Sequence, residues 1–200
     1  REERGVRQEQ LTVFVGQIGE RDVVLERSPC FRELEDLAFL HLEPQEYERV
    51  REEVDRNLTG SEAMIEQIRK ELARSLAEAG IPGEVTGRRK RYHSIAAKMR
   101  RRGVDVAQLY DVLAFRVVMP ETRDCYAVLG LIHQRWRPVP GRIKDYIAMP
   151  KPNFYQSLHT TVMSDSTQPF EVQIRTREMD LIAERGIAAH WKYKEGKLGS

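Results

Sequence analysis

The apolar run Leu113–Met119 constrains the fold of this chain more than any other feature. Arg116 is its only polar residue, and a run of this length is typical of a strand buried within a sheet. Two further strands are expected at residues 158–163 and 170–176, and two helices at 124–136 and 177–191. Strands that alternate with helices, with a meander near the end, predict an α/β (α+β) fold in which helices cover a mixed sheet.

Helical patterns dominate the preceding segment. Hydrophobic residues recur at helical spacing from Phe31 to Leu42, and Pro44 begins a second helical segment. A pattern dense in charge then runs over 46–79, with a new helix expected to start at Ser61. We therefore expect a helical lead-in over 31–82 and a separate domain over 83–200, which begins with a candidate short strand at 84–86. Residues 1–30 contain strand-like stretches at 11–15 and 23–25, compatible with a hairpin or with the remnant of a neighbouring domain.

Composition excludes several classes of protein. The formal net charge is only +2, so any site for anions must come from local clustering of basic residues. The two cysteines, Cys30 and Cys125, lie far apart and form no CxxC pair, which argues against a disulfide framework or a cysteine metal site. No apolar run reaches membrane-spanning length, and the N-terminus has no signal-peptide layout. These features favour a cytoplasmic protein that makes no use of a membrane.

The strongest local clustering of charge lies at residues 87–102, which contain eight lysines or arginines and no acid. On a helix, Lys90, Ser94 and Lys98 would share one face, one turn apart. Two ammonium groups with a hydroxyl between them suit a row of phosphates. A solvated basic face is an equally good interpretation, and a nucleic-acid patch is another, because Tyr92 and His93 offer rings for stacking.

A second pattern lies in the strand expected at 170–176. With period two, Glu171, Gln173 and Arg175 line one face, while the intervening side chains enter the core. This polar row suits the floor of a cleft, although an ordinary half-exposed strand would show the same alternation.

The buried strand carries two charged candidates. Asp111 precedes it, where a carboxylate can hold Mg²⁺ within reach of a ligand. Arg116 lies within the apolar run and needs a partner, either an acidic side chain or a ligand phosphate.

The loop between 140 and 161 has the composition of a second nucleotide pocket. It combines basic side chains with an amide and a flat ring, which suit phosphate contacts and base stacking. The alternatives are a proline-rich surface loop whose aromatic packs inward, and a histidine satisfied within a strand. The residues concerned are Arg142, Lys144, Lys151, Asn153, Tyr155 and His159.

Other nucleotide and hydrolase motifs are missing. The sequence has no GxxxxGK[ST] loop and no GxGxxG after a strand, which excludes a P-loop and a Rossmann cradle. It also has no HExxH, no serine elbow and no kinase HRD or DFG set.

Six segments within 87–196 together resemble the synthetase domain of the RelA/SpoT family. They are GRRKRYHSIAAKM, YDVLAFRVV, DCYAVLGLIH, PGRIKDYIAMPKPNFYQSLHTT, EVQIRT and GIAAHWKYKEG. LEDLAFLHLEP is similar to the helix that precedes this domain in long members. The resemblance implies a nucleotidyltransferase-like sheet of about five strands, flanked by helices. It also implies pyrophosphoryl transfer from ATP to the 3′-hydroxyl of GDP or GTP, which makes the guanosine tetra- or pentaphosphate alarmone of the stringent response.

The resemblance also assigns roles to residues. Asp111 and Glu171 match the acidic pair that handles Mg²⁺, with Mn²⁺ as a possible substitute, and Glu171 matches the proposed activator of the acceptor hydroxyl. The ATP pattern falls on Arg88, Lys90, Ser94, Lys98 and Arg116. The guanine-nucleotide pattern falls on Lys144, Lys151, Asn153, Tyr155 and His159, with Tyr155 stacking on the base. The roles of Arg142, Gln173 and Arg175 are less defined.

Departures from the family pattern limit these expectations. Long members carry a hydrolase domain marked by a His-Asp dipeptide, which this chain lacks, so no alarmone hydrolysis is expected. The RIKD loop nevertheless resembles that of bifunctional members, which suggests a piece of a longer protein. Contacts to a ribosome or tRNA would need domains absent from this chain. Two alternatives remain: a non-catalytic nucleotide- or RNA-binding module, and a related nucleotidyltransferase with another acceptor.

Overall fold

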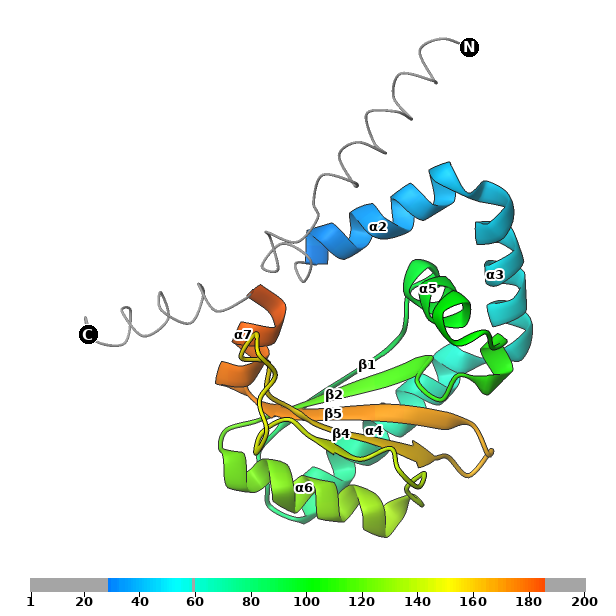
Figure 1. Cartoon of the computed structure of the whole chain (residues 1–200). Helices are drawn as coiled ribbons and strands as arrows, with labels where there is room; N and C mark the ends of the chain where they lie inside the picture. Colours follow the sequence, from blue (N-terminus) through cyan, green and yellow to red (C-terminus); the bar gives the residue numbers. More distant parts are fainter. Residues whose placement is uncertain (1–28, 59, 186–200) are drawn as a thin grey trace.

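A mixed five-stranded sheet forms the centre of the protein (Figure 1). The computed structural model describes residues 29–58 and 60–185. The strand order is β1-β2-β5-β4-β3; β2 and β5 are parallel, and the other neighbours are antiparallel. The bounds are β1 Glu84–Arg89, β2 Leu113–Met119, β3 Lys144–Asp145, β4 Leu158–Met163 and β5 Pro169–Thr176. The mixed sheet predicted from the sequence is confirmed.

The helices also follow the predicted order. They are α2 Pro29–Leu42, α3 Pro44–Asn57, α4 Ser61–Glu78, α5 Tyr92–Arg102, α6 Thr122–Arg135 and α7 Arg177–Arg185, with a short 3-10 helix at Val106–Gln108. The strand-like stretches expected at 11–15 and 23–25, and the end of the helix expected at 177–191, lie outside the described residues. None of the described helices combines the length and the apolar character needed to cross a membrane.

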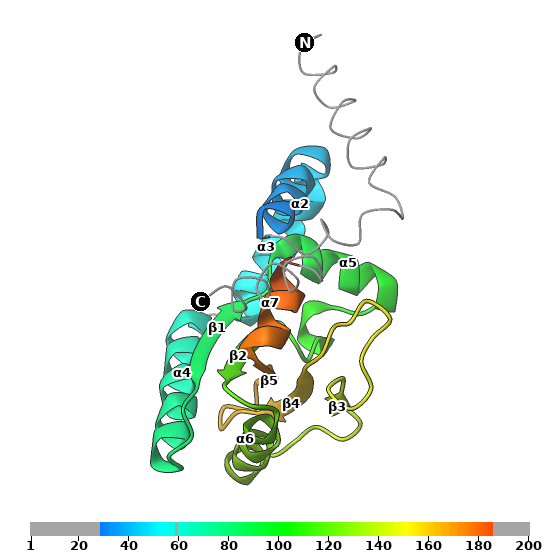
Figure 2. The same cartoon turned by 90° about the vertical axis from the view of Figure 1, so that its left-hand side faces the viewer.

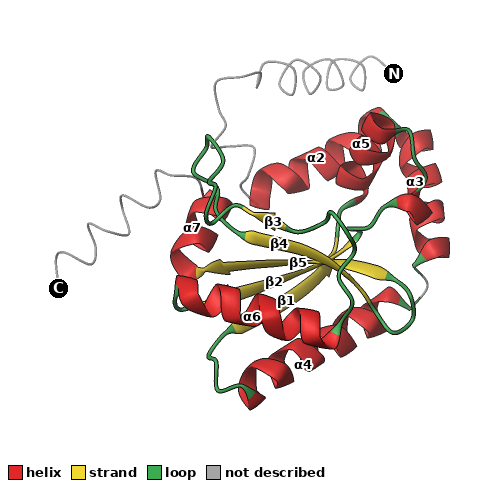
Figure 3. Ribbon diagram, turned by 60° about the horizontal axis from the view of Figure 1, so that its bottom comes forward, coloured by secondary structure: helices red, strands yellow, loops and turns green. Residues whose placement is uncertain are grey.

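One face of the sheet is apolar and is covered by α4 and α6 (Figure 3). Val117 of β2 lies among Leu72 of α4 and Val128 and Ile132 of α6, and all four side chains are buried. Period two along β2 and β5 directs alternate apolar side chains to this face, which explains why Leu113–Met119 is so hydrophobic.

The opposite face is polar, and α5 and α7 stand over its two ends (Figures 1 and 2). The parallel register pairs Ala114 with Glu171 and Arg116 with Gln173. Directly paired residues point to the same face, so the charged row predicted on β5 continues onto β2. This face is therefore the one available for a polar site.

The lead-in helices α2 and α3 pack on α5 through a series of aromatic rings in contact. The rings of Phe39 and Tyr47 meet edge to face at 5.6 Å, and those of Tyr47 and Tyr92 at 5.4 Å. In addition, the backbone N–H of His93 donates to Asp36 Oδ1 at 2.9 Å, so a carboxylate of α2 caps the first turn of α5. These contacts fix α5 above the polar face.

The prediction that Lys90, Ser94 and Lys98 share one helical face is wrong for Lys90. Strand β1 continues to Arg89, and the backbone N–H of Lys90 donates to the carbonyl of Val112 at 2.8 Å. Helix α5 starts only at Tyr92. The run of basic residues in the sequence could not reveal where β1 ends and α5 begins, because this boundary is set by the pairing of the segment with β2.

Gly87 explains part of this extended conformation. A Cβ atom there would lie 2.6 Å from Cε1 of Phe115 and 2.9 Å from Cγ2 of Ile65. Phe115 is buried and Ile65 is partly buried against the core, so a glycine here lets β1 approach them closely.

We predict that Gly87→Ala lowers the free energy of unfolding by about 1–3 kcal/mol, because the added methyl group overpacks the core. Urea denaturation of the purified chain measures this difference. Gly130→Ala is the control: its Cβ would meet nothing within 4 Å, so stability should be unchanged or rise by about 1 kcal/mol. A Gly87→Ala variant as stable as the wild type would contradict this account of packing.

Candidate active site

A cavity of about 370 Å³ opens on the polar face of the sheet. Basic side chains from β1, β2 and the 140–156 loop surround it, together with polar side chains of β4 and β5. Among its lining residues are Arg88, Lys90, Arg116, Lys151, Tyr155, His159, Gln173, Arg175 and Glu184. The cavity therefore brings together residues that the sequence assigned to two different nucleotides.

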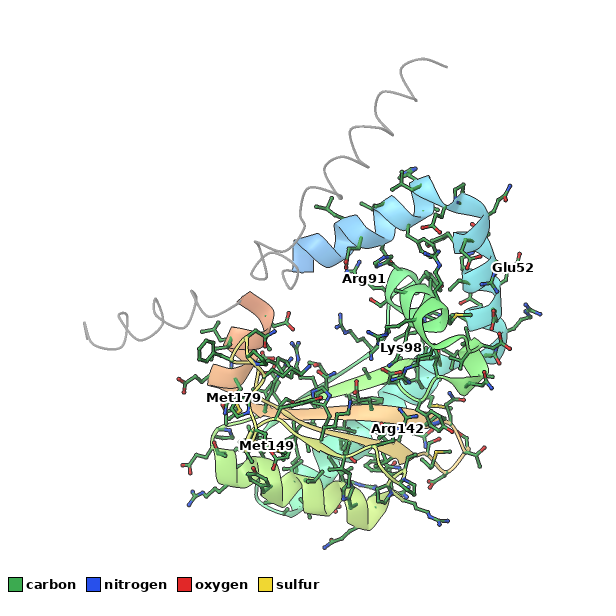
Figure 4. The ribbon with its side chains drawn as sticks, in the orientation of Figure 1. Glu52, Arg91, Lys98, Arg142, Met149 and Met179 are labelled. Carbon is green, nitrogen blue, oxygen red and sulfur yellow. The ribbon has the colours of Figure 1, made fainter. Side chains whose placement is uncertain are left out.

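Asp111 and Glu171 meet beside this cavity through a shared lysine. Lys90 Nζ donates to Asp111 Oδ2 at 2.6 Å and lies 3.4 Å from Glu171 Oε2. Lys98 reaches the same oxygen of Asp111 from α5, which places it between helix and sheet (Figure 4). The two carboxylates precede or open neighbouring parallel strands, so they lie at the same end of the sheet.

Burial and charge act in opposite directions on these acids. Burial alone would raise the pKa of Asp111, but the positive charges and hydrogen bonds of Lys90 and Lys98 outweigh it, and the pKa lies below its ordinary value. Burial is also opposed at Glu171, where a hydrogen bond from His159 and the charge of Lys90 hold the pKa well below the usual range. For Lys98, burial dominates and lowers the pKa despite the bond to Asp111. Both carboxylates are therefore ionised at neutral pH.

Glu171 is fixed by three donors. Besides Lys90, it accepts a hydrogen bond from Gln173 Nε2 at 3.0 Å and one from His159 Nδ1 at 3.2 Å. The other ring nitrogen of His159 lies 2.7 Å from the hydroxyl of Tyr155. A neutral His159 satisfies both contacts if Nδ1 carries the proton and Tyr155 donates to Nε2. This series of hydrogen bonds holds the Glu171 carboxylate facing the residues that line the cavity.

The acidic pair fits a magnesium ion shared with a ligand better than a closed metal site. Over residues 29–58 and 60–185, no group of three or more His, Cys, Asp or Glu side chains is arranged to hold a metal. Mg²⁺ in nucleotide sites is commonly held by one or two carboxylates, with phosphates and water as the other ligands. The position between Asp111 and Glu171 already accommodates the positive charge of Lys90. The donor set therefore fits such an ion.

Of the other residues assigned to ATP, Arg88 and Arg116 line the cavity. Arg116 NH1 contacts two acids of α7, Asp180 at 3.2 Å and Glu184 at 3.1 Å. Ser94 is exposed on α5 and is not among the cavity-lining residues. Arginines of β1 and β2 thus form a positively charged wall of the cavity. The predicted hydroxyl of Ser94 is not part of it.

Only part of the predicted guanine set reaches the cavity. Lys151, Tyr155 and His159 line it, and the Lys151 ammonium lies 5.1 Å from the centre of the Tyr155 ring. Tyr155 is only 9% exposed, which agrees with the alternative that its ring packs inward. Stacking of a base on Tyr155 stays a prediction.

The remaining three predicted residues of the loop are not among those that line the cavity. Asn153 Oδ1 accepts the backbone N–H of Tyr155 at 3.2 Å and so shapes the loop. Lys144 is exposed in β3, paired with His159 of β4. The Arg142 guanidinium lies 4.7 Å from the ring centre of Tyr110. None of these three contacts shows that the residue would touch a bound nucleotide.

Sequence reasoning missed Asp180 and Glu184. Both belong to α7, and Glu184 lines the cavity. A signal was available: Arg175 was expected on a strand with no named partner, and two acids four residues apart follow it on a helix.

We predict a pH dependence of stability that Glu171→Gln removes. Since the folded-state pKa of Glu171 lies below the value of 4.5 for the free side chain, its ionised form stabilises the fold above that pH. This contribution is lost as the pH falls further. Urea denaturation without divalent metal should show that the difference in stability between wild type and variant shrinks as the pH falls from 4.5 toward about pH 3. A constant difference would contradict the lowered pKa.

Comparison with known proteins agrees with this geometry. The sequence model described as "Region found in RelA / SpoT proteins" matches residues 87–198. A GTP pyrophosphokinase of Myxococcus xanthus is 50% identical over 165 residues, which are 82% of this chain and 22% of that protein. The bifunctional (p)ppGpp synthase/hydrolase RelA of Mycobacterium tuberculosis is 46% identical over 165 residues, which are 82% of this chain and 22% of the relative. The chain thus spans about a fifth of the length of these curated relatives.

Solved structures show the same architecture. The small alarmone synthetase 1 of Bacillus subtilis has 28% identity and a TM-score of 0.56, over 70% of this chain and 80% of that one. The same enzyme bound to its product pppGpp has 28% identity and a TM-score of 0.55, over 71% and 82%. The nucleotidyltransferase-like fold implied by the sequence resemblance is therefore confirmed. On the family match and these relatives, the chain belongs to the RelA/SpoT family.

Proposed function

We propose that this domain transfers a pyrophosphoryl group from ATP to the 3′-hydroxyl of GDP or GTP. One observation carries the proposal: Asp111 and Glu171 converge on Lys90 at the edge of a cavity lined with further cations. Relatives named GTP pyrophosphokinase support the same reaction. With these nucleotides as substrates, we also propose a cytoplasmic location and a role in the stringent response.

Neutralisation of negative charge is the main requirement of this reaction. The 3′-oxygen of the acceptor forms a bond to the β-phosphorus of ATP, the bond from that phosphorus to the α–β bridging oxygen breaks, and AMP leaves. Negative charge spreads over the phosphoryl oxygens in the transition state. Arg88, Lys90 and Lys151 line the cavity and supply fixed positive charge, which needs no reorganisation during the step.

Glu171 is the group that we assign to the acceptor hydroxyl. It is ionised and rigidly held, so it can accept a hydrogen bond from the 3′-hydroxyl and orient the oxygen. A carboxylate with a lowered pKa is a weak base. Movement of Lys90 from Glu171 to an incoming phosphate would remove one of the interactions that lower this pKa and would make Glu171 a better proton acceptor.

Asp111 and Glu171 would hold the magnesium ion, or manganese in its place, together with nucleotide phosphates. When bound, such an ion would add positive charge at the transferred group. The requirement for a cation at this place already agrees with the two lysines that Asp111 attracts.

A non-catalytic nucleotide- or RNA-binding module is the main alternative. It would keep the cations but has no need of two carboxylates, one buried and one largely buried, at the edge of the same cavity. We also expect no alarmone hydrolysis from these 200 residues, because the His-Asp step of the family's hydrolase site is missing from the sequence. No ribosome or tRNA contact is proposed for them.

We predict that Glu171→Gln and Asp111→Asn each lower the rate of alarmone synthesis by about 10²–10⁴-fold, because each removes a group aimed at the reacting atoms. Chromatography of reactions with ATP, Mg²⁺ and GDP or GTP would follow AMP and the guanosine tetra- or pentaphosphate. Arg177→Gln is the control, since Arg177 forms an exposed ion pair with Glu84, and it should retain full activity. Full activity of Glu171→Gln would exclude Glu171 as the activator, and wild-type protein without product would exclude the proposed function.

The two interpretations of Tyr155 predict different kinetics. If its ring stacks on guanine, Tyr155→Leu should raise the KM for GDP by about 10-fold or more, the loss expected for one stacked base. Tyr155→Phe keeps the ring and should leave the KM for GDP nearly unchanged. The KM for ATP should be the same in both variants. Equal KM values for GDP in the two variants would show that the ring serves packing alone.

A further inference from the structure

Four charged side chains form a cluster at the α7 end of the cavity. Arg116 of β2 and Arg175 of β5 face Asp180 and Glu184 of α7. Asp180 Oδ1 lies 3.2 Å from Arg116 and 2.9 Å from Arg175. Glu184 Oε1 lies 3.1 Å from Arg116 and 3.7 Å from Arg175. Each acid therefore bridges both arginines.

Arg175 makes this arrangement necessary. Its side chain is only 4% exposed, and a buried guanidinium requires a counter-charge. Helix α7 begins directly after β5, and residues four apart on a helix share a face, so Asp180 and Glu184 return over the sheet toward Arg175. The buried charge of Arg175 thus anchors the helix that carries both acids.

Arg116 is less buried, with one third of its side chain exposed, and it lines the cavity. Without the acids, it would be repelled by Arg175 and would lose its fixed conformation, because a long side chain has many rotamers. The two contacts to NH1 and one from Nε to Thr86 Oγ1 at 3.4 Å restrict it to one position above the sheet. The acids therefore decide where this cation stands.

That position lies at a defined offset from the carboxylate pair. Ala114 pairs with Glu171, and Arg116 follows two residues later on the same face. At about 3.3 Å per residue, Arg116 starts roughly 7 Å further along the strand. A nucleotide whose β-phosphate lies beside Glu171, and whose AMP portion runs along the strand, would bring that portion to Arg116. A planar guanidinium there suits either the α-phosphate or the face of the base.

We propose that Asp180 and Glu184 are positioning residues that hold Arg116 over the α7 end of the cavity and thereby set the affinity for the donor nucleotide. The inference rests on the proposed function, because it takes ATP as the donor. It assigns to α7 a role in binding one substrate and not the other. The opposite possibility is that the acids compete with the nucleotide for Arg116, in which case their removal would strengthen binding.

Kinetics of charge-neutral variants distinguish these possibilities. Glu184→Gln leaves Arg175 its closer partner Asp180, so this variant should fold, and its KM for ATP should rise about 3-fold. The double variant Asp180→Asn, Glu184→Gln should raise it on the order of 10-fold. The KM for GDP and kcat should stay within about two-fold of the wild type. Glu178→Gln, at an exposed acid of the same helix that does not line the cavity, is the matched control and should leave the KM for ATP unchanged.

A double-mutant cycle tests whether the acids act through Arg116. In an Arg116→Met background, Glu184→Gln should produce no further rise in the KM for ATP. A further rise of the same size would overturn the positioning role. A fall in the KM for ATP in Glu184→Gln would overturn it in favour of competition. Equal changes in both KM values, or in kcat alone, would show a merely structural role and would overturn it too.

Calorimetric binding of a non-hydrolysable ATP analogue separates this inference from the proposed function. Weaker binding to Glu184→Gln than to wild type and Glu178→Gln supports the positioning role even if no alarmone is formed. Unchanged binding overturns the positioning role even if the wild type is fully active. Absence of product from the wild type, by contrast, counts only against the proposed reaction.

Discussion

The parallel pairing of β2 with β5 is the constraint on which the site depends. Because the two strands run in the same direction, Asp111, just ahead of β2, and Glu171, near the start of β5, lie at the same end of the sheet. Asp111 and Glu171 meet there for this reason. Two residues beyond Glu171 the same register sets Arg116 opposite Gln173, and four residues beyond it Val118 lies opposite Arg175. One pairing thus separates an acidic end from an arginine-rich end of a single face.

Charge balance within this face follows from that separation. At one end two carboxylates are compensated by Lys90 and Lys98, which approach from different elements. At the other end two guanidinium groups are compensated by two acids of α7. Burial of the carboxylates without the lysines, or of the guanidinium groups without the acids, would cost several kcal/mol per charge. The acidic end therefore requires α5 to be docked on the sheet, and the arginine-rich end requires α7. The helices over the polar face are therefore held by the same charges that shape the cavity.

Periodicity predicted the sheet well, because the signal lies within each strand. The bounds of Leu113–Met119 and Leu158–Met163 are those expected, and β5 begins one residue early. The two-residue strand β3 gave no periodic signal and was missed. Lys90 was placed on a helix because its neighbours are basic, whereas its conformation is set by Val112 across the sheet.

The site was predictable in identity but not in arrangement. The sequence named both acids and every lysine and arginine that lines the cavity, since carboxylate, ammonium and guanidinium chemistry is visible in single residues. It could not show that Tyr155 is buried under Lys151 or that Asn153 braces a loop, because these follow from local packing. It also gave Arg175 no partner, since ion pairing between a strand and the next helix depends on how that helix returns over the sheet.

Strand β1 lies at the margin of the sheet, with only β2 as a hydrogen-bonded neighbour among the described strands. Such a margin exposes backbone donors and acceptors that could recruit a strand from another molecule. Here the marginal strand ends in Arg88 and Arg89, and the opposite margin is only two residues long. A strand added there would have to desolvate these guanidinium groups, and Arg89 is already paired with Asp55 at 2.8 Å. The charged end of β1 would then also disfavour self-association of the protein into extended sheets.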